Sequence, residues 1–103
     1  MGYVVVAYRP KPGCEVELLA LTREHHGILA GEGLVTDRSP IIAGAKDGTI
    51  VEIFEWQPDG VERAHTNPAV LDLWKRYGAV CDYVSLATLP ESSELFAGFE
   101  ALN

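Results

Sequence analysis

Basic residues are scarce in this sequence, and no long apolar run occurs. Eight Lys and Arg stand against 15 Asp and Glu, which gives a formal net charge of −7. Because that balance repels phosphate backbones and anionic membrane surfaces, we expect neither nucleic acid nor a membrane as a partner. A helix that spans a membrane needs about 20 consecutive apolar residues. No stretch of the 103 residues approaches that length.

Cysteine and the common cofactor motifs are also scarce or missing. Cys14 and Cys81 are the only cysteines, too few for a disulfide framework. Phosphate-binding, dinucleotide-binding, nucleophile-elbow and zinc-helix motifs do not occur, so we expect no cofactor and no metal. The first residues lack the basic region of a signal peptide. Together with the two thiols, this indicates a cytoplasmic protein.

The composition that remains is that of a folded protein. Hydrophobic residues make up 48% of the chain and charged residues 22%, which is ordinary for a globular protein. A chain of 103 residues corresponds to one domain, so we expect a single domain over residues 1–103.

Four segments rich in β-branched and aromatic residues predict strands. They are residues 3–8, 41–46, 49–56 and 83–89. Asp47 and Gly48 separate the second segment from the third, and this dipeptide predicts a two-residue hairpin turn.

Helical spacing of apolar residues predicts a first helix over residues 14–31. Asn67 followed by Pro68 is a capping residue with proline at the first helical position, so a second long helix is expected to begin there. A short helix is expected after the turn residues 58–60, and a terminal helix over residues 92–99.

The order strand, helix, strand, strand, helix, strand predicts an α+β fold of the ferredoxin-like split βαβ type. Such a fold has a four-stranded antiparallel sheet with helices on one face. The other face also carries apolar residues, and one small chain has little left to cover it. We therefore expect a homodimer in which the two sheets pack together.

Glu52 is a carboxylate among large apolar neighbours. It shares a strand face with Ile50, Phe54 and Trp56, because alternate residues of a strand point the same way. If helices cover that face, Glu52 can pair with His25, which falls on the apolar face of the first helix. If they cover the other face, Glu52 lies at the dimer interface. The alternation leaves both arrangements open.

His25 and His65 are the candidate catalytic bases, because imidazole titrates near neutral pH. For His25 the alternative is a buried core residue that needs a hydrogen-bond partner. His65 follows Trp56 across a turn, so both are expected to face one pocket. The alternative for His65 is a helix-end side chain bonded to the backbone.

Aromatic residues supply the candidate substrate-binding surface. The arrangement suits either a pocket for a flat molecule or plain core packing. The residues assigned to this surface are Trp56, Trp74, Tyr77, Glu52 and Phe54.

Several short motifs combine with the element order into a resemblance. Pro12-Gly13 precedes the first helix, a strand ends in Glu55-Trp56, and Ala64-His65, Asn67-Pro68-Ala69-Val70 and Leu73-Trp74 follow. Together they resemble the antibiotic-biosynthesis-monooxygenase-like (ABM) family of the dimeric α/β-barrel superfamily. The resemblance covers roughly residues 3–89.

The resemblance implies a homodimer with a small-molecule cleft between sheet and helices. It also implies a cofactor-independent monooxygenase acting on an aromatic or quinol-like substrate. Trp56 matches the strand-end tryptophan that lines the cleft, and His65 the histidine of the following helix. The haem-degrading branch also has an asparagine on the first strand, whereas residues 3–8 contain none. The alternative function is a non-catalytic dimeric binding or accessory module.

Overall fold

A computed structural model describes residues 2–103 of the chain. It has five strands, three α-helices and two short 3₁₀ turns. In chain order they are β1 (Tyr3–Pro10), α1 (Glu15–Gly31), β2 (Ile41–Gly44), β3 (Ile50–Glu55), α2 (Gly60–Ala64), α3 (Pro68–Val80), β4 (Cys81–Val84), η1 (Leu86–Thr88), η2 (Pro90–Ser93) and β5 (Glu100–Ala101).

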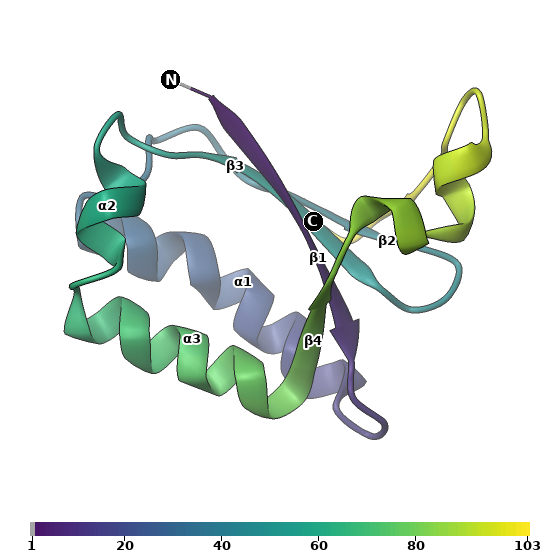
Figure 1. The fold of residues 1–103 in the computed structure, drawn as a ribbon, viewed down its shortest axis with the longest axis horizontal. Coiled ribbons are helices and arrows are strands. Elements are labelled where there is room, and N and C mark those ends of the chain that lie inside the picture. The colour runs from purple at the N-terminus through teal and green to yellow at the C-terminus, as the bar shows by residue number, and fades with distance from the viewer. Residues whose placement is uncertain (1) are drawn as a thin grey trace.

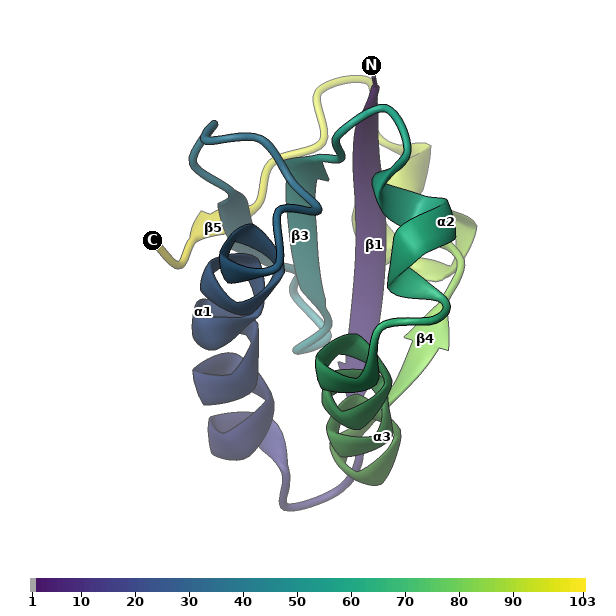
Figure 2. The same ribbon diagram turned by 90° about the vertical axis from the view of Figure 1, so that its left-hand side faces the viewer.

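The strands form one antiparallel sheet in the order β4-β1-β3-β2-β5. Helices α1 and α3 lie side by side across one face of this sheet (Figures 1 and 2). The predicted α+β class and the antiparallel sheet are therefore confirmed. The predicted number of four strands is wrong, because the short strand β5 adds a fifth on the β2 edge.

The hairpin between β2 and β3 also differs from the prediction. Ala45 N donates to Thr49 O and Gly48 N to Ala45 O, so the loop has three residues, 46–48, rather than two. Gly48 adopts a φ of 89°, as the last residue of such a loop requires. Asp47 Oδ1 accepts from Thr49 N at 2.9 Å, which fixes the loop from within.

The C-terminal part of the chain is where the predicted elements fail. Residues 83–89 were predicted as a strand, but β4 ends at Val84. Ser85 then caps the turn η1 by accepting from Ala87 N at 3.2 Å. Residues 92–99 do not form the predicted helix: after η2 they continue as a turn and extended chain into β5.

The core lies between the sheet and the two long helices. The cap predicted for α3 is present, since Asn67 Oδ1 accepts from Ala69 N at 2.9 Å and from Val70 N at 3.2 Å. Large side chains from both layers fill the core; the most deeply buried are Tyr8, Leu18, Leu29, Leu34, Val70, Leu73 and Tyr77.

Candidate functional site

Glu52 lies on the face of the sheet that the helices cover. It is 0% exposed, and its Oε1 accepts from the Tyr8 hydroxyl at 2.7 Å. Nδ1 of His25 lies 2.8 Å from the same oxygen. The alternation of residues along β3 allowed Glu52 to face either the helices or a dimer interface. This contact shows that Glu52 faces the helices and pairs with His25 on α1.

The His25 ring is held on three sides. Its Nδ1 is bonded to Glu52, and the rings of Phe54 and Tyr77 pack nearly perpendicular to it, with ring centroids 5.4 and 5.2 Å away. Because a carboxylate only accepts hydrogen bonds, Nδ1 is the nitrogen that carries the proton. Nε2 is then free to accept a proton or a hydrogen bond from a ligand.

A second layer of aromatic rings supports this pair. The Tyr8 ring stacks on Tyr77 with centroids 4.6 Å apart and an interplanar angle of 17°. Tyr77 in turn donates to Thr22 Oγ1 at 3.2 Å, and Thr22 to Leu18 O at 2.9 Å. Both hydroxyls of the stacked tyrosines are thus bonded, which satisfies polar groups that burial would otherwise penalise.

An apolar cavity of about 320 Å³ opens beside this network. We call it the inner cavity. Its volume suits a small molecule. It is lined by Val4, Val6, Tyr8, His25, Phe54, Trp56, Trp74 and Tyr83.

Burial keeps the phenols of this region neutral. It raises the pKa of Tyr8 far above its usual value, and the neighbouring Glu52 carboxylate raises that pKa further. Partial burial raises the pKa of Tyr83, which remains 54% exposed, to about 12. Tyr8 therefore remains a hydrogen-bond donor to Glu52 at physiological pH.

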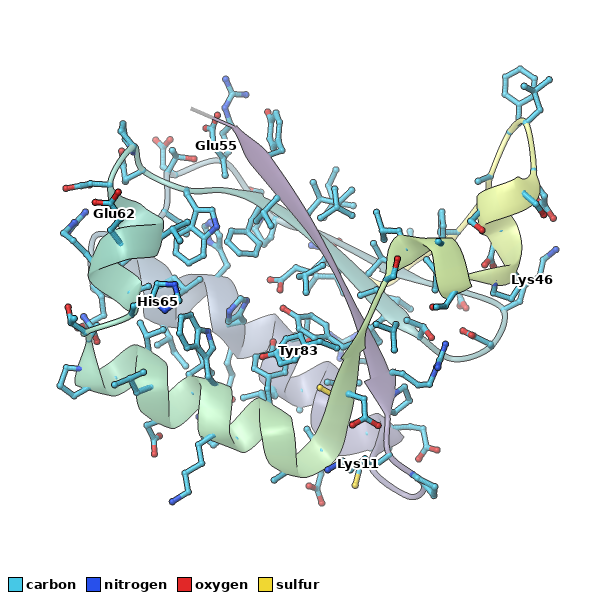
Figure 3. All side chains as sticks on the ribbon, in the orientation of Figure 1. Lys11, Lys46, Glu55, Glu62, His65 and Tyr83 are labelled. Atoms are coloured by element: carbon cyan, nitrogen blue, oxygen red, sulfur yellow. The ribbon has the colours of Figure 1, made fainter. Side chains whose placement is uncertain are left out.

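His65 lies apart from the inner cavity. It follows α2, is exposed to solvent, and its ring packs on Trp74 at a centroid distance of 5.3 Å. Figure 3 shows it at the junction of α2 and α3. The structure therefore brings His25, Phe54, Trp56 and Trp74 to the inner cavity, but His65 does not line it.

Three tyrosines lie near the site in ways the sequence did not indicate. Tyr77 is 0% exposed and supports the floor instead of lining the cavity. Tyr8 and Tyr83, which we did not select from the sequence, are cross-strand partners on β1 and β4 and both line the cavity. Figure 3 shows Tyr83 near the middle of the molecule. The sequence signal that could have identified them is a tyrosine in each of two predicted strands, at residues 8 and 83.

A larger apolar depression of about 600 Å³ lies on the opposite face of the sheet. We call it the outer groove. No ionisable side chain lines it, so it offers no acid or base for chemistry. It is formed by strand residues and by the C-terminal segment: Val5, Ile41, Ile42, Ala43, Val51, Ile53, Leu86, Leu89, Ser92, Phe99, Ala101 and Asn103.

Metal ligands are not grouped in the described part of the chain: within residues 2–103, no three His, Cys, Asp or Glu side chains are placed to share an ion. Over the same residues, no helix has the length and apolar character to cross a membrane. Comparisons with protein-family models, with curated proteins and with solved structures find no match for this chain.

Proposed function

We propose that the inner cavity binds a small aromatic or quinol-like molecule and that the protein acts on it as a cofactor-independent monooxygenase of the ABM-like kind. One observation carries this proposal. A histidine oriented by a buried carboxylate, 2.8 Å from Nδ1 to Oε1, stands on the wall of an otherwise apolar cavity. That combination suits removal of a proton from an apolar substrate.

The chemistry assigned to the chain is proton removal, orientation and exclusion of water. His25 Nε2 takes the acidic proton of the substrate, and Glu52 stabilises the imidazolium that results. Aromatic rings of Trp56 and Trp74 hold the substrate anion flat in a dry pocket. In a substrate of the anthrone type, dioxygen then converts the ring CH₂ to C=O and supplies the carbonyl oxygen. Its second oxygen atom leaves as water, which takes up the remaining ring hydrogen and the proton returned by His25.

The choice of His25 over His65 rests on position. His25 is 4% exposed and lines the inner cavity, whereas His65 is exposed and does not line it. We therefore assign the base to His25. His65 becomes a matched control, because it is a histidine of the same chain that contacts a cavity residue from outside.

The fold supports a dimeric α/β barrel built from ferredoxin-like units. The strand order β4-β1-β3-β2 is the one that the split βαβ arrangement produces when both helices cover one face. On the bare face, Val5 and Ile41 remain 41% and 56% exposed. A second copy of the chain covering this face removes that apolar surface from water.

Oxygen uptake with a panel of hydroquinones and anthrones tests the activity. We expect uptake by the wild type, a loss of about 10²-fold or more in His25→Ala, and less than a threefold change in His65→Ala. Circular dichroism of each variant establishes that it is folded. Absence of uptake with every compound, or equal rates in the wild type and His25→Ala, would contradict the proposal.

The second candidate is a non-catalytic binding module, favoured by the depth at which Glu52 and His25 are buried. Buried hydrogen-bonded pairs of this kind also serve only to specify a core. Quenching of Trp56 and Trp74 fluorescence by the same compounds, without oxygen uptake, would support this candidate.

A further inference from the structure

Leu95 and Phe96 are the two most exposed large apolar side chains among residues 2–103. They are 92% and 90% exposed, and they occupy the turn between η2 and β5. We call this pair the C-terminal knob. Figures 1 and 2 show the segment that carries it projecting from the sheet on the side away from α1 and α3. Adjacent large apolar side chains left this bare mark an interaction surface.

The segment that carries the knob is fixed at both ends. Before the knob, the carboxylate of Glu91, which is 0% exposed, accepts from Lys46 N at 2.8 Å. After the knob, Leu102 N donates to Ile42 O, and Asn103 Oδ1 accepts from Ile42 N, both at 2.9 Å. The knob is therefore presented by a turn whose two ends are bonded to the sheet and its hairpin. A surface held in place in this way loses less conformational entropy on binding.

The outer groove lies on the same side of the sheet as the knob. Leu86, Leu89 and Phe99, which flank the knob in sequence, help to line it. The exposure of Leu95 and Phe96 means that the knob does not fill the groove of its own chain. Both the groove and the knob are uncharged, so each matches the other in chemistry.

We propose that the knob of each protomer occupies the outer groove of a second copy of the chain. Because one chain carries both a knob and a groove, a two-fold axis makes the contact twice and leaves neither unfilled. This inference rests on the homodimer proposed above and adds the element that anchors it. A phenylalanine that enters an apolar pocket is the kind of side chain that dominates interface affinity.

Two variants separate the two halves of the contact. Phe96→Ser removes the knob and leaves the groove intact. Ala43→Leu fills the groove and leaves the knob intact. Val16→Ser is the matched control, because Val16 is also apolar and 83% exposed but lies on α1, on the helical side of the molecule.

Sedimentation velocity over a dilution series and native mass spectrometry measure the assembly. We expect a wild-type dimer, at least a tenfold weaker dimer in Phe96→Ser and in Ala43→Leu, and no change in Val16→Ser. The decisive sample mixes the two weakened variants. Their heterodimer retains one complete knob-and-groove contact, so it should form at concentrations where the Phe96→Ser homodimer, which has no knob, dissociates.

The outcomes that overturn the inference differ from those that overturn the proposed function. A wild-type monomer at micromolar concentration overturns both the dimer and the anchor. A dimer that Phe96→Ser and Ala43→Leu leave as strong as Val16→Ser overturns the anchor alone. Open-ended oligomers overturn the two-fold exchange. Binding and turnover in the inner cavity are scored separately by fluorescence and oxygen uptake.

Discussion

His25 Nδ1 and Glu52 Oε1 lie 2.8 Å apart across 27 positions of sequence. The contact joins helix α1 to strand β3 and is buried on both sides, with exposures of 4% and 0%. A buried charge or hydrogen-bond donor without a partner lowers the free energy of unfolding. Each member of this pair supplies the partner that the other needs. The pair therefore fixes which imidazole nitrogen meets the inner cavity.

The tautomer of His25 gives the first prediction. In the wild type, proton-detected ¹⁵N spectra should show a protonated Nδ1 and a bare Nε2. Glu52→Gln can turn its NH₂ group toward Nδ1, which favours the other tautomer and removes the acceptor from the cavity. We expect turnover to fall by about 10²–10⁴-fold while the substrate KM changes little.

Tyr8→Phe is the control for that prediction. It removes the Tyr8 bond to Glu52 at 2.7 Å but leaves the His25 contact in place. We expect a loss of about 1.5–3 kcal/mol in the free energy of unfolding, typical of a hydrogen bond to a charged group, with the His25 tautomer unchanged. An unaltered tautomer in Glu52→Gln would contradict the orienting role of Glu52.

Gly60 gives a prediction about stability. A Cβ at this position would meet Leu34 O at 2.2 Å and Trp56 Cε3 at 3.0 Å, so the backbone of the neighbouring loop would have to move. We expect Gly60→Ala to lower the free energy of unfolding by about 1–3 kcal/mol, measured by urea denaturation. It should also disturb the fluorescence of Trp56, a cavity-lining residue.

Gly78 supplies the matched control in α3. Nothing lies within 4 Å of a Cβ built there, and the residue is inside the helix Pro68–Val80. Alanine is the better helix former by about 1 kcal/mol, so Gly78→Ala should raise the free energy of unfolding. Equal effects of the two substitutions would show that the close approach at Gly60 is not a constraint.

Alkaline pH gives the third prediction. Burial raises the pKa of Tyr8 and of Tyr77 well above the usual 10.0. Above about pH 10 the unfolded chain loses these protons while the folded chain keeps them, so stability falls as pH rises. The buried tyrosines make their full contribution to the free energy of unfolding below about pH 10. That contribution is lost as the pH rises toward their folded-state pKa values.

The slope of the free energy of unfolding against pH above about pH 10 measures how many tyrosines keep their protons in the folded state. Each fully buried phenol contributes up to about 1.4 kcal/mol per pH unit. Urea denaturation at several pH values above 10 should show this decline, and Tyr8→Phe should lessen it. A free energy of unfolding that stays flat between pH 9 and pH 11 would contradict the burial of these hydroxyls.

Helices α1 and α3 and the strand faces could be predicted because local patterns determine them. The cap at Asn67 and the buried face of α1, which includes His25, follow from spacing and side-chain chemistry alone. The shared face of Glu52 and Phe54 follows from alternation. What alternation cannot supply is the side on which the helices pack, because that depends on how distant elements meet.

The C-terminal segment could not be predicted for a related reason. Residues 83–89 have strand-like composition, but strand β4 ends at Val84 because the Ser85 hydroxyl accepts from Ala87 N and caps a turn. Leu95 and Phe96 fit the apolar side of a docked helix, yet within one chain they contact little. Composition shows that a residue is apolar and does not show which surface covers it.

The two cysteines give the last prediction. Burial raises the pKa of the Cys81 thiol from its usual 9.0 to about 11, and Asp82 adds to this. Since the thiolate is the reactive form, Cys81 in the folded protein should react with iodoacetamide about 100-fold more slowly than in urea at pH 8.

Cys14 is only half-buried and should be labelled first. Mass spectrometry of timed samples resolves the two sites, with Cys14→Ser and Cys81→Ser assigning each rate. Faster labelling of Cys81 than of Cys14 in the native protein would mean that the junction of α3 and β4 opens more readily than its 2% exposure implies.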